Sequence, residues 1–158
     1  MIREPPISVA PLNDAADAAW LEQLDAVLRA ARPALVSVGE HLAPVRERLL
    51  DAAGDAERIL CAASSSGRAI GIVDAALHAP APGDLTISQL AVARAHRFRG
   101  VGRALIGAAL READARGDIE RIHAAVKTSV PEALTFWLAL GFEIVAQDAG
   151  VQSLVRAP

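Results

Sequence analysis

The segment from Leu85 to Leu105 constrains the fold of this chain more than any other. Its first part, 85–92, is apolar and predicts a strand, and the turn after it carries three arginines and one histidine before Gly100, Gly102 and a helix rich in Ala and Leu. A strand, a Gly-rich turn and a helix start together bind phosphate well, because the first helical amides have no intrahelical partner and the helix dipole favours anions. Arginines add charge and bidentate donors. The segment predicts an anion site, although the glycines could also simply permit a tight turn and the arginines form a solvated rim.

Composition excludes several other classes of protein. The 158 residues predict one domain spanning 1–158 with a sizeable core, and the hydrophobic fraction of 53% with 22% charged residues is typical of a globular protein. A net charge of −3, a pI near 5.8 and an aromatic fraction of 3% argue against a nucleic-acid binder. No apolar stretch is long enough to cross a membrane and the first residues do not form a signal peptide, so we expect a cytoplasmic protein. The lone Cys61, in a strand-like run, predicts a buried structural thiol rather than a nucleophile, in a reducing compartment.

Hydrophobic periodicity and turn residues predict the order of elements. Three sequential strands followed by two strand–helix units indicate an α/β domain, a mixed sheet with helices on its faces. We expect Asn13 or Asp14 to cap the first helix and Gly117 to adopt a left-handed conformation after the third. The predicted strands are 7–12, 58–63, 68–77, 85–92, 119–126, 142–146 and 151–156, with a hairpin loop at 64–67, and the predicted helices run from the cap to Pro33, around 42–54, from about 100 to 116 and from Pro131 to about 140.

Two familiar phosphate-binding loops do not fit. A dinucleotide fold needs G-x-G-x-x-G near the first strand, whereas here the motif lies in the middle of the chain and Leu105 stands where the third glycine belongs. A P-loop needs G-x-x-x-x-G-K-[ST], and the sequence has no such run.

The run Arg97-x-x-Gly100-x-Gly102 resembles the Q/R-x-x-G-x-G/A signature of the GNAT superfamily, the acyl-coenzyme A N-acyltransferases. Upstream, 90–92 (Leu-Ala-Val) is similar to that family's fourth strand. Downstream, 133–142 (A-L-T-F-W-L-A-L-G-F) is similar to its A-x-x-[FL]-Y-x-x-L-G-F segment, and 152–155 has the form of its closing strand. The likeness covers 58–155, while the first fifty or so residues match only as a strand and two helices.

The resemblance implies a GNAT-like fold and a way of binding acetyl-CoA. The fold is a mixed, mostly antiparallel sheet of about six to seven strands with about four helices, in which the fourth and fifth strands splay apart. The pantetheine arm then pairs with exposed backbone of the fourth strand, and the pyrophosphate lies on amides between Phe98 and Ala104. Arg94 and His96 either meet the adenosine 3′-phosphate or face solvent. The implied cofactor-binding residues are Leu90, Ala91, Val92, Arg97, Phe98, Arg99, Gly100, Val101, Gly102, Arg103, Ala104, Phe136 and Trp137.

The resemblance also implies the reaction. Family members transfer the acetyl group of acetyl-CoA to a primary amine, on a small molecule or a peptide, by direct attack on the thioester, and a backbone N–H near Val92 would hold the oxyanion. No metal is implied. The identity of the acceptor, the length of the acyl group and the oligomeric state stay open, although dimers are frequent among similar proteins.

The chain departs from the family pattern at three places. Trp137 stands where a tyrosine acid is usual, and an indole cannot supply a proton, so we favour packing as its role. Val130 replaces a frequent asparagine, and Ser88 and Gln89 occupy the region where a glutamate base is common. These departures support an alternative, a non-catalytic or regulatory acyl-CoA-binding module on the same fold.

A general base must therefore come from elsewhere, or be absent. Even spacing predicts that Asp74 and His78 share one face of a strand, and His123 is expected to face solvent. Neutralising a lysine acceptor of pKa about 10.4 at pH 7.4 costs about 4 kcal/mol, whereas an α-amine of pKa about 8 costs under about 1 kcal/mol. Without a base, an α-amine is the more plausible acceptor. The candidate bases are Asp84, His78, Asp74, His41 and Glu40, and for each of them a surface residue is the favoured explanation.

Overall fold

The computed structural model describes residues 3–13, 16–36 and 42–158. Within these residues one sheet of seven strands has the order β1-β2-β3-β4-β5-β7-β6, and every neighbouring pair is antiparallel except β4 and β5. This confirms the mixed, mostly antiparallel sheet, with the first strand at an edge. The strands are β1 (Ile7–Pro11), β2 (Arg58–Ser65), β3 (Arg68–Leu77), β4 (Asp84–Val92), β5 (Arg121–Lys127), β6 (Glu143–Asp148) and β7 (Val151–Arg156), and the helices are α1 (Ala18–Ala31), α2 (Val45–Ala53), α3 (Val101–Arg116) and α4 (Pro131–Ala139), with 3₁₀ turns η1 (Arg32–Ala34) and η3 (Arg94–His96).

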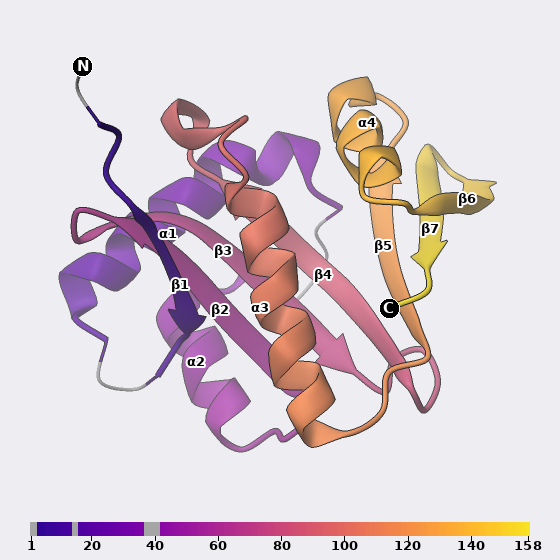
Figure 1. The fold of residues 1–158 in the computed structure, drawn as a ribbon, viewed down its shortest axis with the longest axis horizontal. Helices are drawn as coiled ribbons and strands as arrows, with labels where there is room; N and C mark the ends of the chain where they lie inside the picture. Colours follow the sequence, from indigo (N-terminus) through magenta and orange to yellow (C-terminus); the bar gives the residue numbers. More distant parts are fainter. Residues whose placement is uncertain (1–2, 14–15, 37–41) are drawn as a thin grey trace.

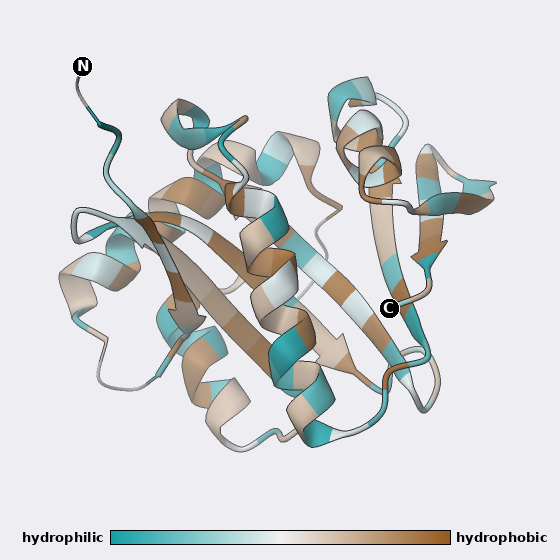
Figure 2. Ribbon diagram, in the orientation of Figure 1, coloured by the Kyte–Doolittle hydropathy of each residue, from teal (hydrophilic) through white to brown (hydrophobic). Residues whose placement is uncertain are grey.

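Helices cover both faces of the sheet (Figure 1). On one face α3 and α4 pack over a core that includes Leu85, Leu105 and Ile122; on the other, α1 and α2 cover a smaller core around Leu24, Val45 and Ile72. The apolar residues of α1 recur at helical spacing, which is why one side of the helix is buried and the other exposed. Figure 2 shows that the central strands are largely hydrophobic, whereas hydrophobic and hydrophilic residues alternate along the helices.

Gly71 in β3 sets how closely α3 approaches the sheet. A Cβ at this position would lie 2.9 Å from Cδ1 of Leu105 and 3.1 Å from the carbonyl oxygen of Ala91. Only glycine leaves room for that contact without displacing the backbone of β4. The start of α3 is thereby held close to the end of β4.

The two parallel strands separate soon after they meet. β4 pairs with β5 only through Asp84–Thr86 opposite Arg121–His123, and beyond this rung the strands diverge (Figure 1). The β3–β4 register also shifts: Asp74 lies opposite Gln89 but Ala75 lies opposite Ile87, so Ser88 is an extra residue in β4. A bulge of this kind bends its strand. The predicted splay of the fourth and fifth strands is confirmed.

Several local predictions were wrong at element ends. Asp17 caps α1 by accepting a hydrogen bond from the amide of Ala19 at 2.7 Å, so Asn13 does not, and Asp14 lies outside the described residues. The second helix starts at Val45 and leaves Leu42 exposed ahead of it. Several neighbouring polar residues could cap each helix, so the sequence alone does not fix the residue at which the helix begins.

Turn geometry accounts for the other differences. Residues 64 and 65 extend β2, because Ser66 and Gly67, with φ of 52° and 76°, suffice for the hairpin turn. Gly117 has φ of 160°, which is extended rather than left-handed backbone, and the strand predicted from residue 119 begins at Arg121. Among the described residues, none of the helices combines the length and apolarity needed to cross a membrane.

Candidate functional site

The backbone of β4 faces the opening between the strands with alternate residues. The amide of Ala93 donates to the carbonyl of Ile70 in the direction of β3, at 2.7 Å. Because peptide groups alternate along a strand, Ala91 also faces β3, whereas the N–H and C=O groups of Leu90 and Val92 face the side from which β5 has departed. Of the three predicted pantetheine partners, these two present their backbone to the opening.

The turn after β4 holds a run of amides without protein partners. Within the described residues, the N–H groups of residues 98–103 donate to no backbone or side-chain acceptor. The amide of Ala104 is different because it donates to the carbonyl of Gly100 at 3.0 Å. Six successive amides without acceptors thus lie beside the positive end of the α3 dipole, an arrangement that suits the predicted anion, whereas the amide of Ala104 is already used.

Three residues give this turn its shape. Gly100 has φ of 78° and precedes α3, and Phe98 has φ of 63° with its ring fully exposed to solvent. A left-handed conformation is rare for a bulky residue and concentrates at functional turns. Gly102 is buried beneath Phe136 of α4: a Cβ there would lie 3.0 Å from Cζ of that ring.

The basic side chains of the turn point in different directions. The Nε of Arg97 donates to the Val92 carbonyl at 3.4 Å, so this side chain folds back toward β4. Arg99 pairs with Glu4 at 3.2 Å between Nη2 and Oε1, and Arg103 and Arg94 are exposed. His96 is half-buried, and its Nδ1 has no hydrogen-bond partner among the described residues.

Trp137 packs into the core of the α3/α4 face. Its ring makes edge-to-face contacts with Phe136 and Phe142, at centroid distances of 5.2 and 5.0 Å, and the side chain is buried. Such aromatic pairs stabilise a core beyond the area they bury. The geometry agrees with packing as the role of Trp137, and Val130 precedes α4 without a side-chain cap.

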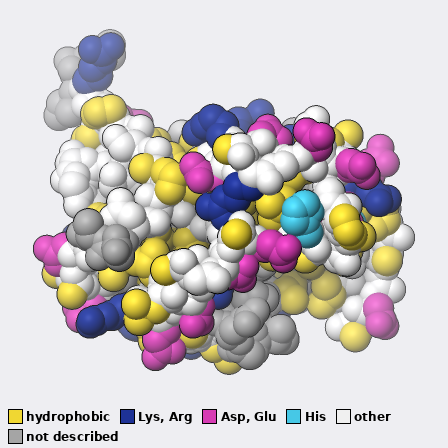
Figure 3. Space-filling view, turned by 90° about the horizontal axis from the view of Figure 1, so that it is seen from below, with side chains coloured by type: hydrophobic (Ala, Val, Ile, Leu, Met, Phe, Trp, Pro, Cys, Tyr) yellow, Lys and Arg dark blue, Asp and Glu magenta, His cyan; other side chains and the backbone are white. Residues whose placement is uncertain are grey.

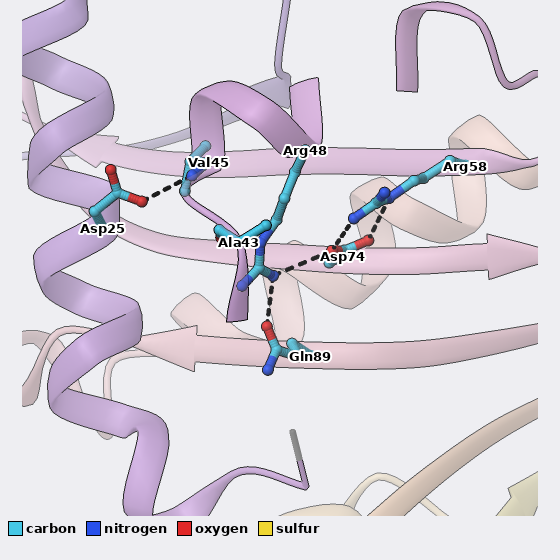
Figure 4. Close-up of polar contacts among 7 residues, drawn as sticks. All are labelled: Asp25, Ala43, Val45, Arg48, Arg58, Asp74 and Gln89. Atoms are coloured by element: carbon cyan, nitrogen blue, oxygen red, sulfur yellow. Dashed lines mark hydrogen bonds and ion pairs between the residues drawn. The ribbon is translucent and has the colours of Figure 1, made fainter. Parts of the chain in front are cut away.

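Asp74 is a buried structural carboxylate and not the surface residue favoured from the sequence. It lies 3.2 Å from Nη1 of Arg48 on α2 and 2.8 Å from Nη2 of Arg58 on β2, and Arg48 also donates to Gln89 of β4 (Figure 4). Burial lowers the pKa of the Arg48 guanidinium, and the attraction of Asp74 opposes that shift. Gln89 is therefore part of the network that holds α2 on the sheet; we call these four residues the α2 network.

His78 does not share a face with Asp74. Because β3 ends at Leu77, His78 lies in the following turn, where it is exposed, has φ of 58° and accepts a hydrogen bond from the amide of Gly83. The two remaining candidates, Glu40 and His41, lie outside the described residues.

Asp84 and His123 form a pair that the sequence did not predict. The Asp84 side chain is 3% exposed and lies 3.3 Å from Nε of Arg121 and 3.1 Å from Nε2 of His123. Asp84 is thus not a surface residue, and His123 does not simply face solvent, because 24% of its side chain is exposed. The pair joins residues nearly forty positions apart, and only the parallel register of β4 and β5 brings them together. Acidic and basic side chains mix at this end of the molecule (Figure 3).

Cys61 is buried in the core under α3, as predicted for a structural thiol. Burial is the main cause that raises the pKa of this thiol from 9.0 to about 11. A thiol that stays protonated is a poor nucleophile, so Cys61 offers no site for an acyl-enzyme.

Two surface hollows lie away from the opening between β4 and β5. One, of about 470 Å³, is bordered by α1 and the strands β1 and β2; the other, of about 650 Å³, is bordered by 52–57, Leu77, His78 and Arg116. Neither includes a residue of β4 or of the turn after it. The unpartnered amides after β4 and the outward-facing backbone of that strand therefore lie outside both hollows.

Comparisons with known proteins agree with this geometry. The structure of an acetyltransferase from Thermus thermophilus has a TM-score of 0.74 and 25% sequence identity, with 96% of this chain and 97% of that chain covered. PaiA N-acetyltransferase from Thermoplasma acidophilum, in complex with coenzyme A, has a TM-score of 0.76 at 13% identity over 97% and 99% of the two chains. Ribosomal-protein-alanine N-acetyltransferase from Brucella melitensis has a TM-score of 0.71 at 18% identity over 96% and 99%. No curated protein sequence matches. The model of the acetyltransferase (GNAT) family matches residues 21–142, which is most of the chain, and the protein therefore belongs to this family.

Proposed function

We propose that this protein is a cytoplasmic N-acetyltransferase that moves the acetyl group of acetyl-CoA to a primary amine by direct attack of the amine on the thioester. Membership of the acetyltransferase family supports acyl transfer in general. The observation that carries the specific proposal is the stretch of unpaired backbone that starts at the amides of 98–103 and continues along the outward-facing groups of Leu90 and Val92. One end suits a pyrophosphate, and the other offers strand-like pairing to an amide-containing arm.

The residues at both ends of this stretch of backbone fit coenzyme A. The amides of 98–103, with Arg99 and Arg103 beside them, would hold the pyrophosphate, and the backbone of Leu90 and Val92 would pair with pantetheine. Bound acetyl-CoA supplies an electrophilic thioester carbonyl. An N–H of β4, for which we propose Val92, would stabilise the oxyanion, and Phe136 and Trp137 would form the wall beside α3.

One experiment tests binding and a second tests turnover. Calorimetric titration with coenzyme A is expected to show a single site per chain. Thiol release from acetyl-CoA is then followed across a panel of primary amines that includes α-amines of peptides, lysine side chains and small diamines. The buried Cys61 should contribute little background to the thiol signal. Failure of every amine in the panel to release thiol would contradict the enzyme proposal.

A second candidate is a regulatory acyl-CoA-binding module. The burial of Trp137 between two aromatic rings favours it, because the usual acid is replaced by a side chain committed to the core. Tight coenzyme A binding together with no thiol release across the whole panel would select this candidate. Loss of a positioned acid costs about 10²–10⁴ in rate, which a thiolate leaving group tolerates, so we place catalysis first.

A further inference from the structure

Phe98 is the most exposed large hydrophobic residue in the part of the chain that the structure describes. It is fully exposed, whereas the next such residue, Leu50, is 67% exposed. Its backbone is also left-handed, with φ of 63°. The ring therefore contributes no burial energy to the fold, while its backbone conformation costs free energy that bulky residues bear mainly at functional sites. The exposed ring and the strained backbone together indicate a role in binding a ligand.

Neither face of the Phe98 ring is covered by its basic neighbours. Nε of Arg97 donates to the carbonyl of Val92 at 3.4 Å, and Nη2 of Arg99 lies 3.2 Å from Oε1 of Glu4. Both guanidinium groups are thus directed to other partners. The aromatic and cation–π contacts within the described residues involve other rings. Both faces of this ring are free to contact a ligand.

A surface for a protein partner explains this ring less well. Apolar docking surfaces are contiguous patches rather than single side chains. The neighbours of Phe98 in the chain are arginines, and Arg103 is exposed at the start of α3. An aromatic ring among cationic side chains suits a small anion that carries a flat aromatic group. The other exposed large hydrophobic residues of the described chain lie in different segments and are Leu42, Leu50, Leu138, Ile144 and Val145.

The ring belongs to residues 98–103, whose unpartnered amides suit a pyrophosphate and which we call the anion turn. The amide of Phe98 is the first of these six, and the segment between β4 and α3 projects beyond the start of that helix (Figure 1). In coenzyme A a single ribose separates the 5′-diphosphate from the adenine. A diphosphate held on these amides therefore keeps the base beside the turn. Aromatic side chains are general platforms for such bases, because every base has a flat π face.

We propose that the ring of Phe98 is the stacking platform for the adenine of coenzyme A. The inference rests on the proposed function for its coenzyme A site and not for turnover. The amides of the anion turn hold the diphosphate, and the ring of the first residue in that turn covers one face of the base. Stacking uses the π face and none of the hydrogen-bonding edges, so this contact selects a planar base and does not read its exocyclic groups.

The test compares Phe98→Ala with the wild-type protein by calorimetry, using three ligands that differ at the nucleotide end. Base–aromatic stacking of ordinary strength predicts that the Kd of coenzyme A rises by about 5- to 100-fold in the variant. Dephospho-coenzyme A, which keeps the adenine and lacks the 3′-phosphate, should show the same loss. The affinity of 4′-phosphopantetheine, which has no adenosine, should not change. Because the ring has no protein contacts to lose, Phe98→Ala should unfold at the same urea concentration as the wild-type protein.

A second variant gives a direct optical signal. Phe98→Trp keeps an aromatic ring at this position, so it should still bind coenzyme A tightly. Adenine stacked on the new indole should quench its fluorescence when coenzyme A or dephospho-coenzyme A binds, whereas 4′-phosphopantetheine should leave the emission unchanged. The contributions of Trp20 and Trp137 are removed by subtracting the same titration of the wild-type protein.

The matched control is Leu50→Ala, which removes another exposed hydrophobic side chain, on α2, and should leave all affinities unchanged. Unchanged coenzyme A affinity in Phe98→Ala would overturn the stacking role. An equal loss for coenzyme A and 4′-phosphopantetheine would also overturn it, because the ring would then only shape the turn. Absence of thiol release with every amine would contradict the enzyme proposal and leave this inference standing. A wild-type protein that binds none of the three ligands would refute the coenzyme A site and this inference with it.

Discussion

The ring of Phe136 lies directly over Gly102, so close that a Cβ would be 3.0 Å from Cζ and 3.1 Å from Cε2. Gly102 is the last glycine of the Arg97-x-x-Gly100-x-Gly102 motif, and Phe136 belongs to the second motif, 133–142, on α4. The two motifs are thus in contact, and a side chain at position 102 would require the Phe136 ring to shift.

We predict that Gly102→Leu loses coenzyme A binding. The added side chain must displace Phe136 and enter the space beside the amides, and overpacking of this kind costs about 1–3 kcal/mol of stability. Calorimetry and thermal unfolding would measure the two effects separately. The control is Gly54→Leu, at a position where no atom lies within 4 Å of a Cβ. Unchanged coenzyme A affinity in a folded Gly102→Leu protein would refute the assignment of the anion turn.

Gly100 allows a second, conformational test. Its φ of 78° is left-handed and nothing surrounds its Cβ position, so Gly100→Ala introduces backbone strain without a clash, costing about 1–2 kcal/mol. Gly67 in the β2–β3 turn is a matched control, because its φ is 76° and its surroundings are equally open. Urea unfolding should show similar losses for both alanine variants, whereas only Gly100→Ala should weaken coenzyme A binding. If Gly100→Ala bound coenzyme A as tightly as Gly67→Ala and the wild-type protein do, the conformation of the turn would not matter for binding.

The contacts of the α2 network predict a large effect on the free energy of unfolding when its carboxylate is removed. Asp74→Ala leaves the guanidinium groups of Arg48 and Arg58 buried without their carboxylate, and breaking a buried pair on one side costs about 3–5 kcal/mol. The free energy of unfolding from urea titration is the measurement. Glu112→Ala, which removes a more exposed pair with Arg116 on α3, should cost no more than about 1 kcal/mol. Similar values for the two variants would show that the network is not energetically distinct.

Cys61 predicts a loss of stability at high pH. Its thiol has a pKa of about 11 in the folded protein, raised from 9.0, so the folded state holds a proton that the unfolded state releases earlier. The contribution of the protonated Cys61 thiol to the free energy of unfolding is fully present below pH 9 and disappears as the pH rises toward 11. Unfolding free energies at pH 8 and pH 10.5 should therefore differ less in Cys61→Ala than in the wild-type protein. A thiol reagent at pH 8 should react with Cys61 only after denaturation, and rapid reaction in the native state would contradict this burial.

The sequence by itself determined the elements and the anion turn. The apolar run of 85–92, the glycines that follow it and the helical spacing of α1 are local signals, because backbone conformation and burial of one face depend on neighbouring residues. The motif at 133–142, together with Arg97-x-x-Gly100-x-Gly102, predicted the splayed sheet through a family resemblance. Local signals failed at helix ends, as with Asp17, because several adjacent polar residues can cap a helix equally well.

Only the tertiary structure decided which titratable groups meet. Asp74 and His78 have the spacing of one strand face, but β3 ends at Leu77, so His78 lies in a turn while Asp74 pairs with Arg48 and Arg58. Asp84 and His123 are far apart in the chain and become neighbours through three residues of parallel pairing. Contacts of this kind depend on strand register, which is set by packing across the whole sheet, so no local pattern of residues could reveal them.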